Sequence, residues 1–292
     1  MLIQQLTDYC DHKIKKCGDC GKRCSHPSGK CSGGCADCLK EIQYHRTNGR
    51  TEYDCPNMLR YYTCHTAWKR CSEILYALET IDLEKYPELN ILSIGCGSAP
   101  DLLAFEQIAG EKKIQYHGID IESMWQEIHD FIKWEDRKYD TMEVAFETQD
   151  IYKVLANGDL SGYNVFVLQY MIAGHIHSDR AEKIDILFDE LIDKIIMNKQ
   201  SESPLLLIIN DIDHKAWICD YFNLFTKKLR KRGLSFNADK RHFEPREDGE
   251  NAGSKLYKSR TNRFLEQIPA EHKDKYNAGD SCSAAQLIVE VN

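Results

Sequence analysis

The sequence predicts an α/β protein, with a sheet that has helices on both faces, preceded by a small, irregular, metal-stabilised domain. From residue 89 onward, short runs rich in β-branched residues alternate with glycine turns and with apolar residues at helical spacing. Before residue 57, cysteines are dense and apolar periodicity is largely missing. We therefore expect a cysteine-rich segment (1–56), a helical connector (57–88) and an α/β domain (89–292).

Length and composition limit the possible classes of protein. With 292 residues and 42% hydrophobic content, the chain can bury one full core and carry a smaller appendage. No stretch approaches the roughly 18 consecutive apolar residues of a membrane span. The first residues also lack the charge-then-apolar order of a signal peptide. We expect a soluble, cytoplasmic protein without a membrane partner.

The cysteines concentrate at the front of the chain, where ten of the 13 lie at or before Cys71. In a chain without a signal peptide, this density indicates bound metal rather than disulfides. Two Cys-x-x-Cys pairs have the spacing that lets both thiolates reach one zinc ion at about 2.3 Å. We predict two zinc sites, one formed by Cys17, Cys20, Cys24 and Cys31, and the other by Cys35, Cys38, His45 and Cys55.

Other readings of these cysteines stay open. Competing ligands for the same ions are Cys10, His12, His26 and Cys64. Cys64 and Cys71 fall in a helical segment, which favours burial in a core for both. The spacing Cys31-x-x-x-Cys35-x-x-Cys38 also resembles that of radical S-adenosylmethionine enzymes, which hold an iron–sulfur cluster. This alternative is less favoured, because the preceding residues have no strand character.

A glycine loop follows the first strand of the α/β domain. The apolar run 89–94 leads into Gly95-Cys-Gly97-Ser98, and helical spacing resumes at Asp101. Without Cβ atoms, Gly95 and Gly97 let the backbone approach a polar ligand closely, while the N–H groups of the following helix point toward it. The pattern indicates a binding loop between a strand and a helix.

A second strand (114–119) ends in Asp120, 23 residues after Gly97. A carboxylate at the tip of the second parallel strand can accept both ribose hydroxyls of an adenosyl ligand. A dinucleotide-binding loop would have a third glycine where this chain has Pro100. Another adenosine-containing cofactor is therefore favoured.

The stretches LSIGCGSAPDLL and YHGIDIES resemble motif I and the following acidic motif of class I S-adenosylmethionine-dependent methyltransferases. The resemblance extends over roughly the last 200 residues. It implies S-adenosylmethionine as the cofactor and a Rossmann-like seven-stranded sheet closed by an antiparallel strand at 285–291. It also implies the cofactor-binding residues Gly95, Gly97, Ser98, Asp120, Ile121, Asp150, Ile151 and Gln169.

The chain departs from the family pattern at one position. The family often has an acidic residue two positions before its first glycine, where this chain has Ser93. The chain therefore lacks the side chain that usually contacts the methionyl ammonium group. Asp101 is a candidate replacement, and a plain acidic residue in the first turn of a helix is the alternative reading.

Methyl transfer is an in-line displacement, so positioning can do most of the work without a covalent intermediate. Tyr170, His175 and His177 follow the fourth strand and are candidates for shaping the pocket or accepting a proton.

The methyl acceptor is predicted from the composition of residues 226–264. Five cations fall within 227–232, and further cations follow with interleaved aromatic residues. Such a mixture suits RNA. The alternatives are a methyltransferase that acts on a small molecule or a protein, and a cofactor-binding scaffold whose zinc segment recognises a partner.

Overall fold

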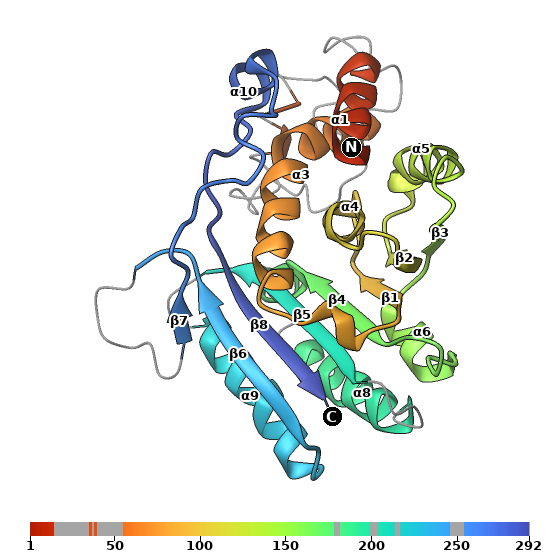
Figure 1. The fold of residues 1–292 in the computed structure, drawn as a ribbon, viewed down its shortest axis with the longest axis vertical. Coiled ribbons are helices and arrows are strands. Elements are labelled where there is room, and N and C mark those ends of the chain that lie inside the picture. Colours follow the sequence, from red (N-terminus) through yellow and green to blue (C-terminus); the bar gives the residue numbers. More distant parts are fainter. Residues whose placement is uncertain are drawn as a thin grey trace.

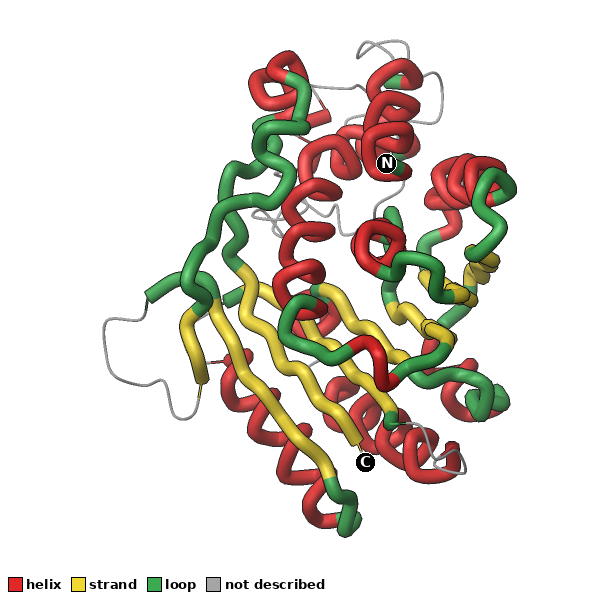
Figure 2. Tube along the Cα trace, viewed as in Figure 1, coloured by secondary structure: helices red, strands yellow, loops and turns green. Residues whose placement is uncertain are grey.

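The computed structural model describes residues 1–14, 35–36, 38–39, 55–177, 182–198, 204–213, 217–245 and 254–291. Within these residues the strands form one continuous sheet in the order β3-β2-β1-β4-β5-β8-β6-β7 (Figure 2). The strands are β1 (Glu88–Ile94), β2 (Lys113–Asp120), β3 (Met142–Thr148), β4 (Val165–Gln169), β5 (Leu205–Ile212), β6 (Phe236–His242), β7 (Ser254–Leu256) and β8 (Ala284–Val291).

The sheet is mostly parallel. Strands β1 to β5 pair in parallel, and β8 inserts antiparallel between β5 and β6, as expected for the closing strand. The described residues form eight strands, so the predicted number of seven was one too few. The additional strand is β7, which pairs with the end of β6. Its three residues are too few to show a period in the sequence.

Helices cover both faces of the sheet, as predicted (Figure 1). Successive side chains of a strand point to opposite faces, so Val165 and Val167 of β4 join one apolar cluster while Phe166 and Leu168 join the other. The helices of the α/β region are α4 (Pro100–Ile108), α5 (Gln126–Asp136), α6 (Ile151–Asn157), α7 (Met171–His177), α8 (Glu182–Asn198) and α9 (Trp217–Lys231).

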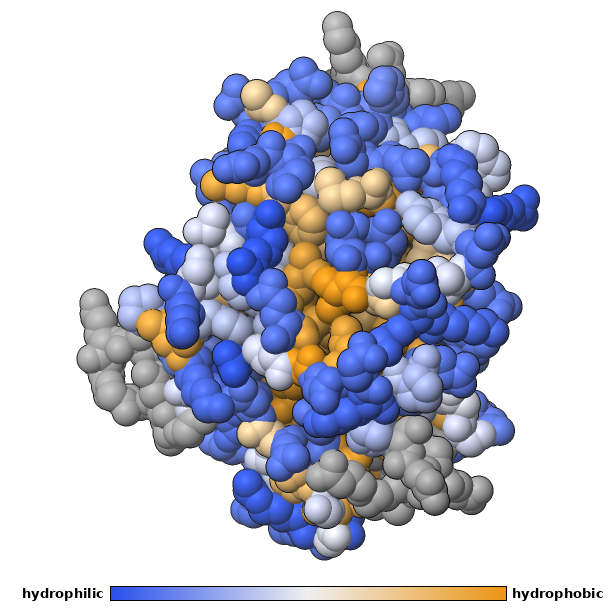
Figure 3. All heavy atoms as spheres, viewed as in Figure 1, coloured by the Kyte–Doolittle hydropathy of each residue, from blue (hydrophilic) through white to orange (hydrophobic). Residues whose placement is uncertain are grey.

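The N-terminal helices belong to the same core as one face of the sheet. Helices α1 (Leu2–Lys13) and α3 (Pro56–Leu78) share an apolar cluster with α4, β1 and β2. Helix α3 also contacts β5 and β8, so it lies across the sheet rather than beside it. Figure 3 shows apolar side chains gathered beside α3 on an otherwise hydrophilic face. Shorter helices are η3 (Leu83–Lys85), η4 (Ser123–Trp125) and α10 (Ala270–Tyr276).

Among the helices described, none combines the length and apolar content that crossing a membrane requires.

Candidate cofactor site

The glycine loop joins β1 to α4 through a tight, left-handed path. Gly95 and Gly97 have φ values of +66° and +51°, and Ala99 at the start of α4 has +54°. The N–H groups of Gly95 and Cys96 donate to the carbonyl of Ile119 in β2, at 2.8 and 3.1 Å. These bonds fix the loop to the end of β2. Glycine, which adopts a positive φ without steric cost, occupies two of the three left-handed positions in the loop.

The two glycines differ in what surrounds them. A Cβ atom on Gly95 would come within 2.2 Å of the Met171 sulfur, so the Met171 side chain would have to move to admit it. A Cβ atom on Gly97 would have an ordinary contact of 3.6 Å with the Trp125 ring. Gly97 is required by its backbone conformation alone.

Asp120 lies at the end of β2 and binds the glycine loop directly. Its carboxylate accepts the N–H of Gly97 at 2.8 Å and that of Glu122 at 2.9 Å. Burial raises the pKa of Asp120, and these two N–H groups oppose that shift. A carboxylate has about four lone-pair positions, so Asp120 keeps capacity to accept from a hydroxyl donor.

The strands place the predicted cofactor residues along one edge. Ile94 pairs with Ile119 of β2 and with Leu168 of β4, and Asp120 pairs with Thr148 of β3. Because parallel strands end at the same edge, the residues that follow each strand are brought together. These residues are Gly95, Gly97, Ser98, Asp120, Ile121, Asp150, Ile151 and Gln169.

Within this row the side chains have distinct environments. Ile121 is 68% exposed, which is unusual for a large aliphatic side chain, and it follows the partly buried Asp120. Asp150 caps α6 by accepting the N–H of Tyr152 at 3.0 Å, and Ile151 is buried. Ser98 and Gln169 are also buried. The exposed apolar surface at the end of β2 therefore comes from Ile121 rather than Ile151.

A cluster beneath the loop was missed by sequence reasoning. His129 of α5 is buried, its Nε2 lies 2.7 Å from the carbonyl oxygen of Gly97, and its ring stacks on Phe146 with centres 4.0 Å apart. Burial lowers the pKa of His129 to about 4, so the ring is neutral at pH 7 and its Nε2 can donate this bond. His129 lies 32 residues after Gly97 in the chain, and no recognisable motif connects the two. This contact could therefore not be predicted from the sequence.

Asp101, the candidate replacement for the missing acidic residue, is buried beneath the loop. It is 1% exposed and accepts the Tyr116 hydroxyl at 3.1 Å. Burial raises its pKa to about 6, against the opposing hydrogen bonds from Ser93 and Tyr116. Its contacts are therefore with the protein interior below the loop.

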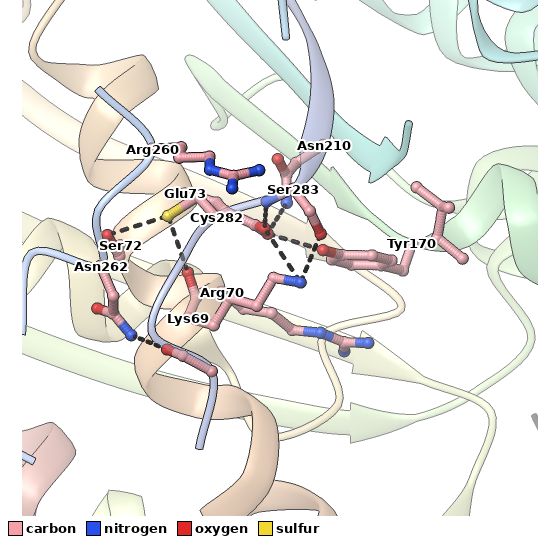
Figure 4. A network of polar contacts seen from close by, with 12 residues as sticks. Lys69, Arg70, Ser72, Glu73, Tyr170, Asn210, Arg260, Asn262, Cys282 and Ser283 are labelled. Carbon is pink, nitrogen blue, oxygen red and sulfur yellow. Dashed lines mark hydrogen bonds and ion pairs between the residues drawn. The ribbon is translucent and has the colours of Figure 1, made fainter. Parts of the chain in front are cut away.

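A network of polar contacts joins α3 to three strands on the other side of the site (Figure 4). At its centre is Glu73, which is completely buried. Its carboxylate accepts the Tyr170 hydroxyl at 2.7 Å, the Asn210 amide at 3.2 Å and the Ser283 N–H at 3.0 Å. Lys69 Nζ lies 4.0 Å from the same carboxylate. A buried charge with this many partners is satisfied and positions the groups that bind it.

Tyr170 connects this network to the end of β4. It has a φ of +57°, which is uncommon for a residue with a bulky side chain. Burial and the neighbouring Glu73 carboxylate raise the pKa of its hydroxyl well above 10. The hydroxyl is therefore a hydrogen-bond donor at neutral pH and is poorly suited to accepting a proton.

The other two candidate catalytic residues lie on α7. His175 Nε2 is 2.7 Å from the Tyr152 hydroxyl, and its Nδ1 is 3.0 Å from the carbonyl of Met171. The side chain of His177 lies outside the described part of the structure. The start of α7 is capped by Asp211, whose carboxylate accepts the Ile172 N–H at 2.8 Å. Burial raises the pKa of Asp211 to about 7.

Most of the predicted zinc ligands lie outside the described residues, namely Cys17, Cys20, Cys24, Cys31 and His45. Of the others, Cys38 and Cys55 are buried and Cys35 is partly exposed. In the described ranges of the chain, no three His, Cys, Asp or Glu residues cluster so as to hold a metal ion. Cys64 and Cys71 are fully buried, as their helical setting predicted.

Two of the five cations within 227–232, Lys228 and Arg232, form ion pairs with acidic residues. In α9, Lys228 binds Asp185 and Asp189 of α8 at 2.8 and 2.7 Å. Arg232 binds Asp189 and Asp193 at 2.8 and 2.6 Å. Of the aromatic residues interleaved with the cations of 226–264, three are buried, namely Phe243, Tyr257 and Phe264. Buried rings cannot stack on bases, so these three aromatic residues do not contribute to a stacking platform for RNA.

No protein-family model matches the chain, and no curated protein sequence matches it. Solved structures with a similar arrangement include the plantazolicin methyltransferase BpumL in complex with SAH, at 12% identity over 100% of both chains with a TM-score of 0.44. A SAM-dependent methyltransferase from Archaeoglobus fulgidus is 16% identical over 76% of this chain and 94% of its own, with a TM-score of 0.39. Human methyltransferase 10 domain containing protein is 10% identical over 76% and 81%, with a TM-score of 0.40. Similarities with identities of 10 to 16% and TM-scores below 0.5 do not assign an activity to this chain.

Proposed function

We propose that the chain is an S-adenosylmethionine-dependent methyltransferase whose cofactor lies along the ends of β1 to β4. The observation that carries the proposal is the bond between the Asp120 carboxylate and the Gly97 N–H. It couples an acidic residue at the end of β2 to a loop held open by two left-handed glycines. A glycine turn with a purely structural role would not require a carboxylate one strand away.

The residues present fit an adenosyl cofactor. The exposed face of Ile121 is suited to packing on a flat base. Asp120 would accept the ribose hydroxyls through its remaining lone pairs. Asp150 would hold the adenine amino group at the start of α6, as the family resemblance implies.

When bound, S-adenosylmethionine supplies an electrophilic methyl group on a sulfonium, and the protein's task is to orient the acceptor in line with it. Tyr170 and Met171 would form the wall of the site at the end of β4. Because the Tyr170 hydroxyl already donates to Glu73, we assign it a positioning role rather than that of a base. Removal of an acceptor proton is left to another group or to solvent.

For the acceptor, the ion pairs of Lys228 and Arg232 favour a small molecule or a protein over RNA. The carboxylates of α8 reduce the charge that Lys228 and Arg232 present to an anionic polymer. Transfer of a labelled methyl group to RNA, protein and metabolite fractions distinguishes these acceptors. The proposal of two zinc ions depends on the cysteine spacing alone, and elemental analysis of the purified protein tests it.

The cofactor assignment is tested with Asp120→Asn. Loss of the charge should weaken S-adenosylhomocysteine binding by about tenfold to a hundredfold, or about 1.5 to 3 kcal/mol. If the carboxylate binds the ribose, the loss should not add to that caused by a 2′-deoxyribose analogue, because both changes remove the same contact. Additive losses in calorimetric titrations would show that Asp120 does not touch the ribose.

A further inference from the structure

Arg70 of α3 lies at the carboxyl end of β4. Its guanidinium carbon is 4.0 Å from the centre of the Tyr170 ring and 4.8 Å from that of the Tyr62 ring. The side-chain amide of Gln169, the last residue of β4, donates to the backbone carbonyl of Arg70 at 3.5 Å. The cation is therefore held beside the strand that neighbours β1 and its glycine loop.

Two sets of contacts lead from Arg70 to the loop. The Tyr62 ring is 6.1 Å from the Trp125 ring, which lies over Gly97. On the other side, Tyr170 is followed by Met171, whose sulfur packs against Gly95. Arg70 thus lies near the end of the row of cofactor residues that is farthest from Asp150.

The position of Arg70 is fixed by the polar network one helical turn away. Glu73 binds Tyr170 just after β4, Asn210 of β5 and Ser283 just before β8, so α3 cannot slide over these strands without breaking several hydrogen bonds. In Figure 4 the Arg70 side chain extends past Glu73 toward the Tyr170 side of the network. A binding residue on a helix held in this way is well placed for precise recognition.

The chemistry at this end of the site favours an anionic group of the ligand. Asp120 and Asp150 mark the ribose and adenine ends, so the amino-acid part would lie toward β4. Ser93 replaces the usual acidic residue and Asp101 is buried with Tyr116, so neither offers an exposed carboxylate to an ammonium group. A guanidinium group offers parallel N–H donors that match a carboxylate, and aromatic rings hold its plane in place.

We propose that Arg70 binds the carboxylate of the amino-acid part of S-adenosylmethionine, an inference that rests on the proposed function. The cofactor would then be held at its amino-acid end from α3, a helix outside the α/β region, instead of from β1. An anionic group on the acceptor is the other ligand that a cation here could bind, and the experiment separates the two.

The test compares S-adenosylhomocysteine with its decarboxylated analogue, which differs only in lacking the carboxylate. In calorimetric titrations, Arg70→Gln should weaken S-adenosylhomocysteine about tenfold to a hundredfold and change the affinity of the analogue by less than about twofold. Arg70→Lys, which keeps the charge without the fork, should give a smaller loss for S-adenosylhomocysteine only. Arg263→Gln is the matched control, because its guanidinium carbon also lies over a tyrosine ring, at 4.1 Å from Tyr76.

Equal losses of affinity for both ligands would overturn the role of Arg70 in binding the carboxylate. An unchanged affinity for S-adenosylhomocysteine would also overturn it, and would instead favour binding of an anionic acceptor by Arg70. If Arg70→Gln shows no cooperative thermal transition, the same comparison is made with Arg70→Lys. Failure of the wild-type chain to bind either ligand would instead overturn the proposed function. Binding of both by wild type, with a loss confined to the carboxylate-bearing ligand in the variants, is the expected result.

Discussion

The two sides of the proposed cofactor site are held in place by contacts of different range. On the glycine-loop side, Gly97 is bound by Asp120 and His129, which are 23 and 32 residues away in the chain. On the α3 side, Glu73 binds Tyr170, Asn210 and Ser283, at separations of 97, 137 and 210 residues. One side is a local unit, and the other exists only when distant segments have come together.

The largest loss of stability is expected on the α3 side, which depends on the single carboxylate of Glu73. Glu73→Ala would leave the Tyr170 hydroxyl, the Asn210 amide and the Ser283 N–H buried without their acceptor. Removing one partner from a buried charged network costs about 3 to 5 kcal/mol. Urea denaturation measures the change in the free energy of unfolding. A loss below about 1 kcal/mol would show that the α3 side does not depend on Glu73.

The glycine-loop side should instead respond to acid through His129. Its folded pKa of about 4 is below the ordinary value of about 6.5, so the unfolded chain takes up this proton first. Its contribution to stability is complete above about pH 6.5 and is lost progressively as the pH falls toward 4, to a total of about 3 kcal/mol. The difference in unfolding free energy between wild type and His129→Gln, measured across this range, isolates the effect. Buried carboxyl groups with raised pKa values cancel in that difference.

Gly95 tests whether the loop needs close packing as well as a left-handed backbone. Gly95→Ala adds strain at a φ of +66° and brings its Cβ against the Met171 sulfur. We expect a destabilisation of about 2 kcal/mol, together with loss of measurable S-adenosylhomocysteine binding. Gly110→Ala is the matched control, because Gly110 has a φ of +61° and no atom within 4 Å of the added Cβ. If the two variants lose equal stability and both bind, the contact with Met171 is unimportant.

The smallest loss of stability is expected for Tyr170→Phe, which tests the role of the hydroxyl separately from that of the ring. Tyr170→Phe removes one hydrogen bond to Glu73 and should lower the free energy of unfolding by about 1.5 kcal/mol. The ring stays beside Arg70, so affinity for S-adenosylhomocysteine should change less than about twofold. Tyr170→Ala should lower both stability and affinity. A large loss of affinity in the phenylalanine variant would give the hydroxyl a direct role in binding.

The difference in range also explains what the sequence could reveal. The glycine loop and Asp120 lie within one strand–helix–strand unit. The change from strand to helical periodicity of apolar residues can be recognised within this short stretch of sequence. Glu73 falls in the stretch CSEILYAL, where a charged residue among apolar neighbours is the single local sign of a buried role. The neighbouring sequence does not indicate which residues bind Glu73, because they lie 97 to 210 residues away. The ion pairs of Lys228 and Arg232 could not be predicted for the same reason, since their acidic partners lie about 40 residues earlier on α8.

The insertion of β8 between β5 and β6 has a consequence for the order in which the protein can fold as it is synthesised. Strands β1 to β5 can pair as they emerge, but β6 reaches the sheet only through β8, which is made after all of them. Glu73 likewise waits for Ser283 and Gln286, more than 200 residues later. Such late, long-range contacts slow folding and leave strand edges exposed in the meantime. During translation, the glycine loop would therefore form before the helix that carries Arg70 is locked over it.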